Sequence, residues 1–359
     1  MKFNNIIIIK KNLYIFFLLG SLIIFFFSTT KSNAKAFEVD NIEISKPFEM
    51  DFDKNHIIDL GFKKGFSELI SLIVNSEDQK KINLVKLNEI KGMIESFSIK
   101  EEKFINEIYY VKLGVLFNKK KVFNFLEKKN IFPSIPNKKK FLFIPILIDE
   151  NKKDLLIFSN NKVFDYWKNF EEKNHLIEYI LPEEDLEDLE LIKKRYNTIE
   201  EYNFNEITNK YNLDTFIVAL IFKNRKQVRI LSRISVDNNV VLRNLSYEDI
   251  DLSDSENLEK LITDLKIYYE DYWKFLNQIN TSIKLPLNIK VSNLNEKKID
   301  GFEKLLGKTD LIYRYSINKI DKDFIYYQII FNSTPSNFLK IMKNNNYSFN
   351  TQNKVWILK

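Results

Sequence analysis

Asp185 and Asp188 form a carboxylate pair inside the most acidic segment of the sequence, PEEDLEDLE, which begins at Pro182. Paired carboxylates can act as general acid and general base in hydrolysis without histidine or metal. Acidic residues in the first turn of a helix also complement its dipole, so a solvated helix start is the simpler interpretation. A divalent cation needs oxygen ligands gathered around a tight turn, and no glycine lies near this segment. Asp185 and Asp188 are therefore candidate catalytic residues only if the protein is a hydrolase.

His175 and Glu178 are a second candidate pair, three residues apart. At that spacing a base and its orienting group can pair on one face of a helix, and His56 and Asp59 have the same spacing. Neither pair has a visible nucleophile, because the G-x-S-x-G motif is absent from the chain. We therefore expect structural histidines and a protein that is not an enzyme.

Several chemistries are excluded by residue types that the chain lacks. It contains no cysteine, which excludes thiol nucleophiles, disulfides, iron–sulfur clusters and cysteine-type zinc sites. Its two histidines are too few for a histidine-rich metal site. Neither glycine-rich phosphate motif, G-x-G-x-x-G or G-x-x-x-x-G-K-[ST], occurs. We expect no cofactor, no cofactor-binding residue and no metal site.

The amino terminus has the pattern of an export signal over residues 1–36. Lysines precede an apolar run, LYIFFLLGSLIIFFF at 13–27, and a polar stretch follows it. Ala34 and Ala36 form the A-x-A arrangement that a signal peptidase accepts, in a chain with only one further alanine. Cleavage after Ala36 is predicted, with a cut after Ala34 as the alternative. The mature protein is then periplasmic.

An uncleaved anchor is the alternative to cleavage. The apolar run is shorter than the roughly 20 residues of a membrane-spanning helix, but the isoleucines before it can extend it. In that case the protein stays anchored in the inner membrane by its amino-terminal helix. The sequence predicts contact with the membrane only through this segment.

The charge balance argues against a nucleic-acid partner. The whole chain has a net charge of +6, and the leader holds five lysines and no acidic residue, so the remainder carries +1. Nucleic-acid binding needs clustered basic residues above the background. We therefore expect no nucleic acid and, as a partner, another protein of the cell envelope. The sequence carries no signal for an oligomeric state.

Residues 37–137 are predicted to form an amino-terminal α+β domain. The segment FPSIPNKKK at 132–140, with two prolines and a lysine run, marks its end. Periodicity predicts strands at 37–44, 96–99 and 108–117, and helices at 56–74, 84–94 and 121–129.

Residues 138–280 are predicted to form a middle α/β domain. It begins with FLFIPILI at 141–148, an apolar strand covered on both faces, although Pro145 argues for a bulge or an edge position. A long helix with an apolar stripe from Leu258 to Leu276 ends the domain. The elements predicted between them are a helix at 163–173, a strand at 177–181, helical stretches within 182–211, and strands at 215–222, 228–234 and 240–244.

Residues 281–359 are predicted to form a carboxy-terminal domain with the order β-α-β-β-α-β, the split or ferredoxin-like order. The first domain begins with the same order of strand, helix, strand, strand and helix, and Gly61-Phe62 is matched by Gly301-Phe302. An internal repeat and chance similarity both remain open. The overall prediction is an α+β fold of three small modules after a signal peptide.

The blocks FEVDNIEIS, YYVKLGVLFNKKKVFNFLEKKNIF, KKKFLFIPILI, LPEEDLEDLELI and KYNLDTFIVALIF, followed by the β-α-β-β-α-β tail, resemble the bacterial envelope proteins of domain of unknown function 2066 (DUF 2066). The resemblance covers the chain after the leader and rests on element order and apolar blocks. It implies a periplasmic protein without known activity, and it implies no catalytic positions. We expect a non-catalytic binding module, with a periplasmic carboxylate hydrolase as the alternative.

Overall fold

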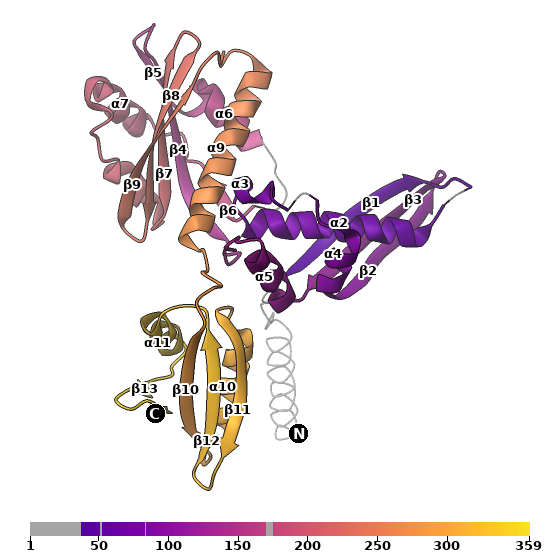
Figure 1. The fold of residues 1–359 in the computed structure, drawn as a ribbon. Helices are drawn as coiled ribbons and strands as arrows, with labels where there is room; N and C mark the ends of the chain where they lie inside the picture. The colour runs from indigo at the N-terminus through magenta and orange to yellow at the C-terminus, as the bar shows by residue number, and fades with distance from the viewer. Residues whose placement is uncertain (1–36, 51, 83, 170–174) are drawn as a thin grey trace, which may run out of the picture. The chain divides into compact units, whose positions relative to one another are not determined.

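The computed structural model describes residues 37–359 apart from 51, 83 and 170–174. The fold is α+β, as predicted, and each of its three sheets comes from one continuous stretch of chain (Figure 1). The predicted leader and the cleavage positions Ala34 and Ala36 lie outside the described residues. Within the described part, no helix combines the length and the apolar character needed to cross a bilayer. The predicted domain boundaries after residues 137 and 280 stay predictions.

The first sheet has the strand order β1-β3-β2. Helix α2, which the periodicity predicted at 56–74, packs on it through an apolar face that includes Phe62, Phe66 and Leu69. Asp53 caps this helix by accepting a hydrogen bond from the Asn55 amide. The elements are β1 (Glu38–Pro47), α2 (Lys54–Ile73), α3 (Ser76–Gln79), α4 (Leu87–Met93), β2 (Ile94–Ile105), β3 (Ile108–Phe117) and α5 (Lys119–Lys128).

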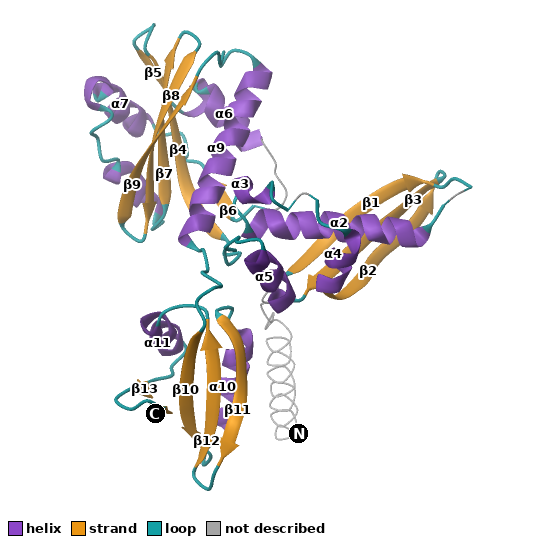
Figure 2. Ribbon diagram, in the orientation of Figure 1, coloured by secondary structure: helices purple, strands orange, loops and turns teal. Residues whose placement is uncertain are grey.

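The second sheet has the order β5-β4-β7-β8-β9, with β6 paired to β4. Strand β4 runs parallel to β6 and β7, whereas the β7–β8 and β8–β9 pairs are antiparallel. Helices cover both of its faces, α6 and α9 on one and α7 and α8 on the other (Figure 2). The elements are β4 (Lys139–Asp149), β5 (Asp154–Leu156), α6 (Lys162–Asn169), β6 (Ile177–Ile180), α7 (Leu186–Lys194), α8 (Asn205–Thr208), β7 (Phe216–Asn224), β8 (Gln227–Val236), β9 (Asn239–Tyr247) and α9 (Ser255–Leu276).

Pro145 lies in an interior strand, whereas the sequence favoured a bulge or an edge position. On one side β4 pairs with β7 along residues 142–149, and on the other it pairs with β6 up to Leu142 and with β5 from Leu147. Pro145 falls in the gap between β6 and β5, where the Asn161 side-chain amide donates to its carbonyl at 3.0 Å. The missing N–H of proline therefore costs no ladder hydrogen bond.

The third sheet has the order β11-β12-β10-β14-β13. Helices α10 and α11 pack on the same face through Phe302 against Tyr327 and through Phe338 against Phe331. The elements are β10 (Leu285–Ser292), α10 (Glu296–Lys308), β11 (Ile312–Ile320), β12 (Phe324–Phe331), α11 (Pro335–Asn344), β13 (Phe349–Asn350) and β14 (Trp356–Leu358).

The last strand departs from the predicted split β-α-β-β-α-β unit. Strand β10 is antiparallel to β12, so a strand entering directly after α11 would run antiparallel to β10. Instead β14 runs parallel to β10, pairing Ile289 with Trp356. The reason is the additional strand β13, which reverses the chain before it reaches β10.

Candidate functional site

The predicted carboxylate pair lies at the start of α7, and both carboxylates share one lysine. Asp185 is the N-cap, and its Oδ1 accepts from the Glu187 amide at 2.8 Å. The Lys210 ammonium donates to Asp185 Oδ2 and to Asp188 Oδ1, at 2.8 Å each. Asp185 is half-buried, whereas Asp188 retains only 3% of its accessible surface. The sequence correctly placed these residues at a helix start, and the lysine that joins them comes from a segment 22 positions later.

The electrostatics of this cluster oppose a proton-donating role for Asp185. The hydrogen bond from Lys210, followed by that from the Glu187 amide, lowers the pKa of Asp185 below its usual value. The hydrogen bonds to Asp185 and Asp188 raise the pKa of Lys210. A glycosidase-type pair needs one carboxyl whose pKa is raised so that it stays protonated. Asp185 is shifted in the opposite direction.

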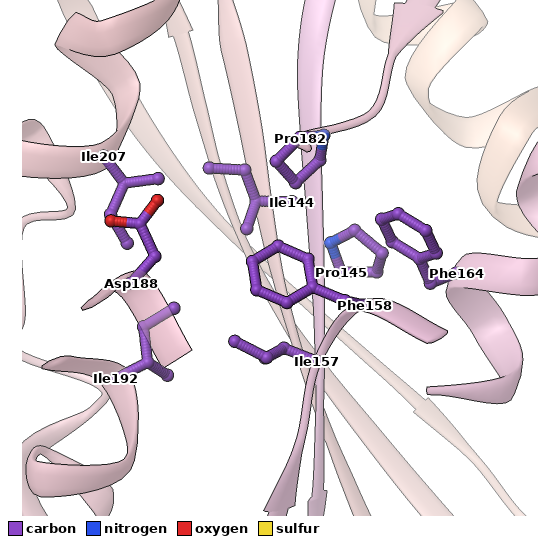
Figure 3. A pocket seen from close by; sticks show the side chains of 9 residues that line it. All are labelled: Ile144, Pro145, Ile157, Phe158, Phe164, Pro182, Asp188, Ile192 and Ile207. Carbon is purple, nitrogen blue, oxygen red and sulfur yellow. The ribbon is translucent and has the colours of Figure 1, made fainter. Parts of the chain in front are cut away.

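A small apolar recess borders Asp188 (Figure 3). Its other lining residues are Ile144, Pro145, Ile157, Phe158, Phe164, Pro182, Ile192 and Ile207. The cavity amounts to about 10 Å³, close to the minimum that holds a single water molecule. Asp188 Oδ2 has no hydrogen-bond partner among the described residues. The recess therefore fits one water-sized hydrogen-bond donor and is too small for a substrate.

The predicted pair of His175 and Glu178 is not formed. Glu178 makes an ion pair with Lys140 at 3.0 Å on the surface. His175 Nδ1 instead lies 3.5 Å from Oε1 of the buried Glu270. Asp59 likewise pairs with Lys91, at 2.7 Å, and not with a histidine on its own helix. The spacing of His175 and Glu178 misled because Glu178 lies in the strand β6 and His175 in the segment before it, so the two residues share no helix face.

Glu270 is a polar anchor that the sequence reasoning missed. Its Oε1 accepts from the amides of Leu176 and Ile177, at 3.0 and 2.8 Å, and so fastens the start of β6 to α9. Lys266, Glu270 and Lys274 recur every fourth residue on α9 and are only 5%, 5% and 6% exposed. Charged residues at constant helical spacing within an apolar stripe were the available signal.

A larger hollow opens at the end of the second sheet. It lies between the start of β4, the turn that joins β8 to β9, and the last turn of α9, and its volume is about 360 Å³. Asp237 and Asn238 form that turn with positive φ angles of 49° and 62°, a conformation that short polar residues tolerate. The lining residues are Asn137, Lys139, Val236, Asp237, Asn239, Tyr272, Trp273, Leu276 and Asn277.

The floor of this hollow is held rigidly and its walls are polar. The Trp273 indole donates to the Asn137 carbonyl at 2.6 Å, and Asn277 donates to the Trp273 carbonyl at 2.8 Å. Lys139 is paired with Asp214 at 2.9 Å, so its charge is largely compensated. Amide and carboxylate groups beside two aromatic rings can hydrogen-bond and pack against a ligand.

Within residues 37–359, leaving out the positions that are not described, no three His, Asp or Glu side chains gather as metal ligands would. No protein-family model matches the chain, and a search of curated proteins found no significant match.

Proposed function

We propose that the protein is exported to the periplasm by its leader and binds another component of the cell envelope there, without catalysing a reaction. The leader pattern with Ala34 and Ala36 supports export, and the resemblance to DUF 2066 agrees with it. If the leader is retained, the same binding function operates from the inner membrane.

The observation that carries the binding function is the hollow beside Tyr272 and Trp273. Its volume of about 360 Å³ lies within the range of roughly 300–1,000 Å³ that is typical of ligand sites. The hollow is lined by aromatic rings and amide groups, and the charge of its one lysine, Lys139, is compensated by Asp214. This lining favours an uncharged ligand with both flat and hydrogen-bonding parts. A polar segment of an envelope protein has this chemistry. We assign the hollow to such a segment.

A periplasmic hydrolase that uses Asp185 and Asp188 is the second candidate function. The observation in its favour is the unpartnered Oδ2 of the buried Asp188. Against it stand the lowered pKa of Asp185 and the size of the recess. A hydrolase screen with the purified protein, repeated with Asp185→Ala, tests this candidate. Turnover that the substitution abolishes would replace the binding function with catalysis.

Export is tested by cell fractionation and amino-terminal sequencing. We expect the protein in the periplasmic fraction, beginning at Phe37 or Lys35. A membrane-bound species that keeps Met1 supports the anchored form. A cytosolic species with an intact Met1 would refute export.

Binding at the hollow is tested with a photo-crosslinking residue in place of Leu276, which lines the hollow and is 44% exposed. Ile317 on β11 is 46% exposed and provides a matched control position. We expect a crosslinked envelope component with the probe at 276 and not at 317. Equal products at both positions, or none at either, would contradict the assignment.

A further inference from the structure

One end of the first sheet carries a cluster of exposed apolar side chains. It consists of the loop that follows β1 and the turn that joins β2 to β3 (Figure 1). We call this cluster the apolar tip. Its members and their exposed fractions are Phe48 51%, Met50 111%, Phe104 56%, Ile105 57% and Ile108 46%. The surface of a soluble protein seldom exposes so many large apolar side chains together unless they bind something.

The two segments of the apolar tip are held together by the fold. The Phe48 amide donates to the Glu107 carbonyl at 2.7 Å, which joins the loop to the turn. The Phe48 ring lies 4.7 Å from that of Phe104 and 4.6 Å from that of Phe52. Phe52 in turn contacts Tyr109, which is only 5% exposed. The exposed rings are thus connected to the core and are preorganised.

The polar backbone of the tip is paired on its inner side. Ile105 and Ile108 pair across the turn, and Asn106 and Glu107 adopt positive φ angles of 51° and 61°, as in a two-residue hairpin. The bond from Phe48 to Glu107 and the β2–β3 ladder pair the inner backbone groups, whereas the outer side of β2, an edge strand, stays open. At the headgroup boundary these outer groups remain within reach of water, so only a shallow insertion suits the tip.

Charged side chains of both signs lie at the base of the tip, and the exposed carboxylates of Glu49 and Glu107 lie in its loop and its turn. Lys54 pairs with Glu102 at 2.7 Å, and Lys103 pairs with Glu101. Glu102 also accepts a hydrogen bond from the Tyr109 hydroxyl at 2.8 Å. Such a mixed rim complements headgroups that carry both a phosphate and an ammonium. It has no basic excess to attract a purely anionic surface.

We propose that the apolar tip inserts into the boundary between headgroups and acyl chains of a zwitterionic phospholipid bilayer. The tip is the protruding end of a hairpin, and a fluid bilayer can surround it without a preformed cavity. This proposal deepens the proposed function and rests on it, because export is what brings the protein next to membranes. It adds a membrane contact that the sequence did not predict, separate from the leader.

The absence of cysteine allows a direct test with the full-length chain. Met50→Cys introduces a single thiol at the tip for an environment-sensitive fluorophore, and Ile320→Cys on β11, 65% exposed in the native protein, is the matched control. With phosphatidylcholine vesicles we expect a blue shift, and quenching by acyl-chain quenchers, at position 50 only. Phosphatidylglycerol vesicles and high salt should not strengthen the response.

A pair of double variants provides the second arm. Phe104→Ser with Ile105→Ser should weaken vesicle binding at position 50 by roughly tenfold or more, because apolar burial supplies the affinity. Ile317→Ser with Ile320→Ser should leave it unchanged. Circular dichroism melting checks that both variants stay folded, as expected for exposed positions.

Four outcomes would overturn the membrane proposal: no response at position 50, an equal response at both labels, a blue shift without lipid that grows with protein concentration, or binding only to anionic vesicles. The third would point to a second copy of the chain as the occupant. The proposed function fails separately, through a cytosolic location or through loss of crosslinking at position 276. Neither of these readouts depends on the tip variants.

Discussion

The first and the third sheets have the same internal strand order and differ in what lies beyond it. In both, the third strand of the region lies between the first and the second, as β1-β3-β2 and as β10-β12-β11. The first sheet ends at β1, whereas β10 has β14 and β13 on its other side. The same order of elements therefore gives one sheet that ends at its first strand and another that continues past its first strand by two more strands. The comparison shows that connectivity is shared while the surroundings of equivalent strands are not.

The matching Gly-Phe pairs show the same contrast at the level of side chains. A Cβ on Gly61 would lie 2.3 Å from Leu113 Cδ1, a side chain of the sheet beneath α2. A Cβ on Gly301 would meet only the Tyr347 hydroxyl, at 2.7 Å. The first glycine lets a helix approach a sheet closely, and the second lies beside the end of the Tyr347 side chain. Identical residues at matching positions, Gly61 and Gly301, therefore have different contacts.

The largest expected difference concerns the two phenylalanines. Phe302→Ala should lower the free energy of unfolding by about 3–5 kcal/mol, because a buried ring is lost. Its ring contacts Tyr327, Tyr347 and Phe349. Phe62→Ala should cost less, about 3 kcal/mol, since its ring partner Phe97 is 48% exposed. Urea denaturation followed by circular dichroism measures both, and equal losses would remove the contrast.

The glycines should give the next largest difference. Gly61→Ala should destabilise by about 1–3 kcal/mol, because Leu113 is completely buried and has little room to move. Gly301→Ala should change stability by less than about 1 kcal/mol, since the helix gain of alanine offsets the displacement of a hydroxyl. Gly92→Ala, with no atom within 4 Å, is the control and should be neutral or stabilising. The prediction fails if Gly301→Ala is the more damaging change.

One tyrosine in the first sheet and one in the third should make the free energy of unfolding sensitive to alkaline pH. Burial, and then the hydrogen bond to Glu102, raise the pKa of Tyr109 from 10.0 to about 12. Burial and the bond to Glu303, at 2.7 Å, raise the pKa of Tyr327 as well. The folded state retains these protons longer than the unfolded state, so the stabilisation is complete below pH 10 and is lost as the pH rises.

Denaturation measured at several pH values between 10 and 12 tests this linkage for Tyr109. The free energy of unfolding of the native protein should fall across this range, and Tyr109→Phe should reduce the slope. Tyr327→Phe should act mainly at higher pH, because Tyr327 is shifted further. An unchanged slope in Tyr109→Phe would show that its phenol is not protected.

The smallest effect is expected for an ion pair on the helix of the third sheet. Lys304→Ala removes the pair with Asp300, 2.6 Å long and exposed on both sides, and should cost about 0.3–0.5 kcal/mol. In the first sheet Lys64 donates instead to the Glu43 carbonyl at 2.9 Å, a bond that depends less on salt. A double-mutant cycle at low and high salt measures the first contribution. A salt-independent loss above this range would contradict the assignment.

Much of the secondary structure was predictable, because it depends on local patterns. The alternation at 108–117 matches β3, and the stripe from Leu258 to Leu276 matches α9. The position of Pro145 was misjudged because its cost depends on which neighbours pair on each side of β4. The direction of β14 was missed because two paired residues, Phe349 and Asn350, are too few to give a periodic signal.

The candidate site was predictable in part only. Asp185 was placed at a helix start from local charge, but its link to Lys210 joins separate segments. His175 was matched with Glu178 by spacing, whereas its actual neighbour Glu270 lies on a distant helix. The hollow and the apolar tip are each built from segments that are far apart in the sequence, so no local pattern marks them.

The amino-acid sequence alone determined most of the helices and strands, the lack of thiol chemistry and the near-neutral charge of residues 37–359, because these follow from composition and from periodicity over neighbouring residues. Tertiary structure decided the parallel β14, the anchoring of β6 by Glu270, and the gathering of Phe48 with Phe104 at one tip. Each of these depends on which distant segments pair. That choice follows from the burial of the whole chain and not from any single stretch of it.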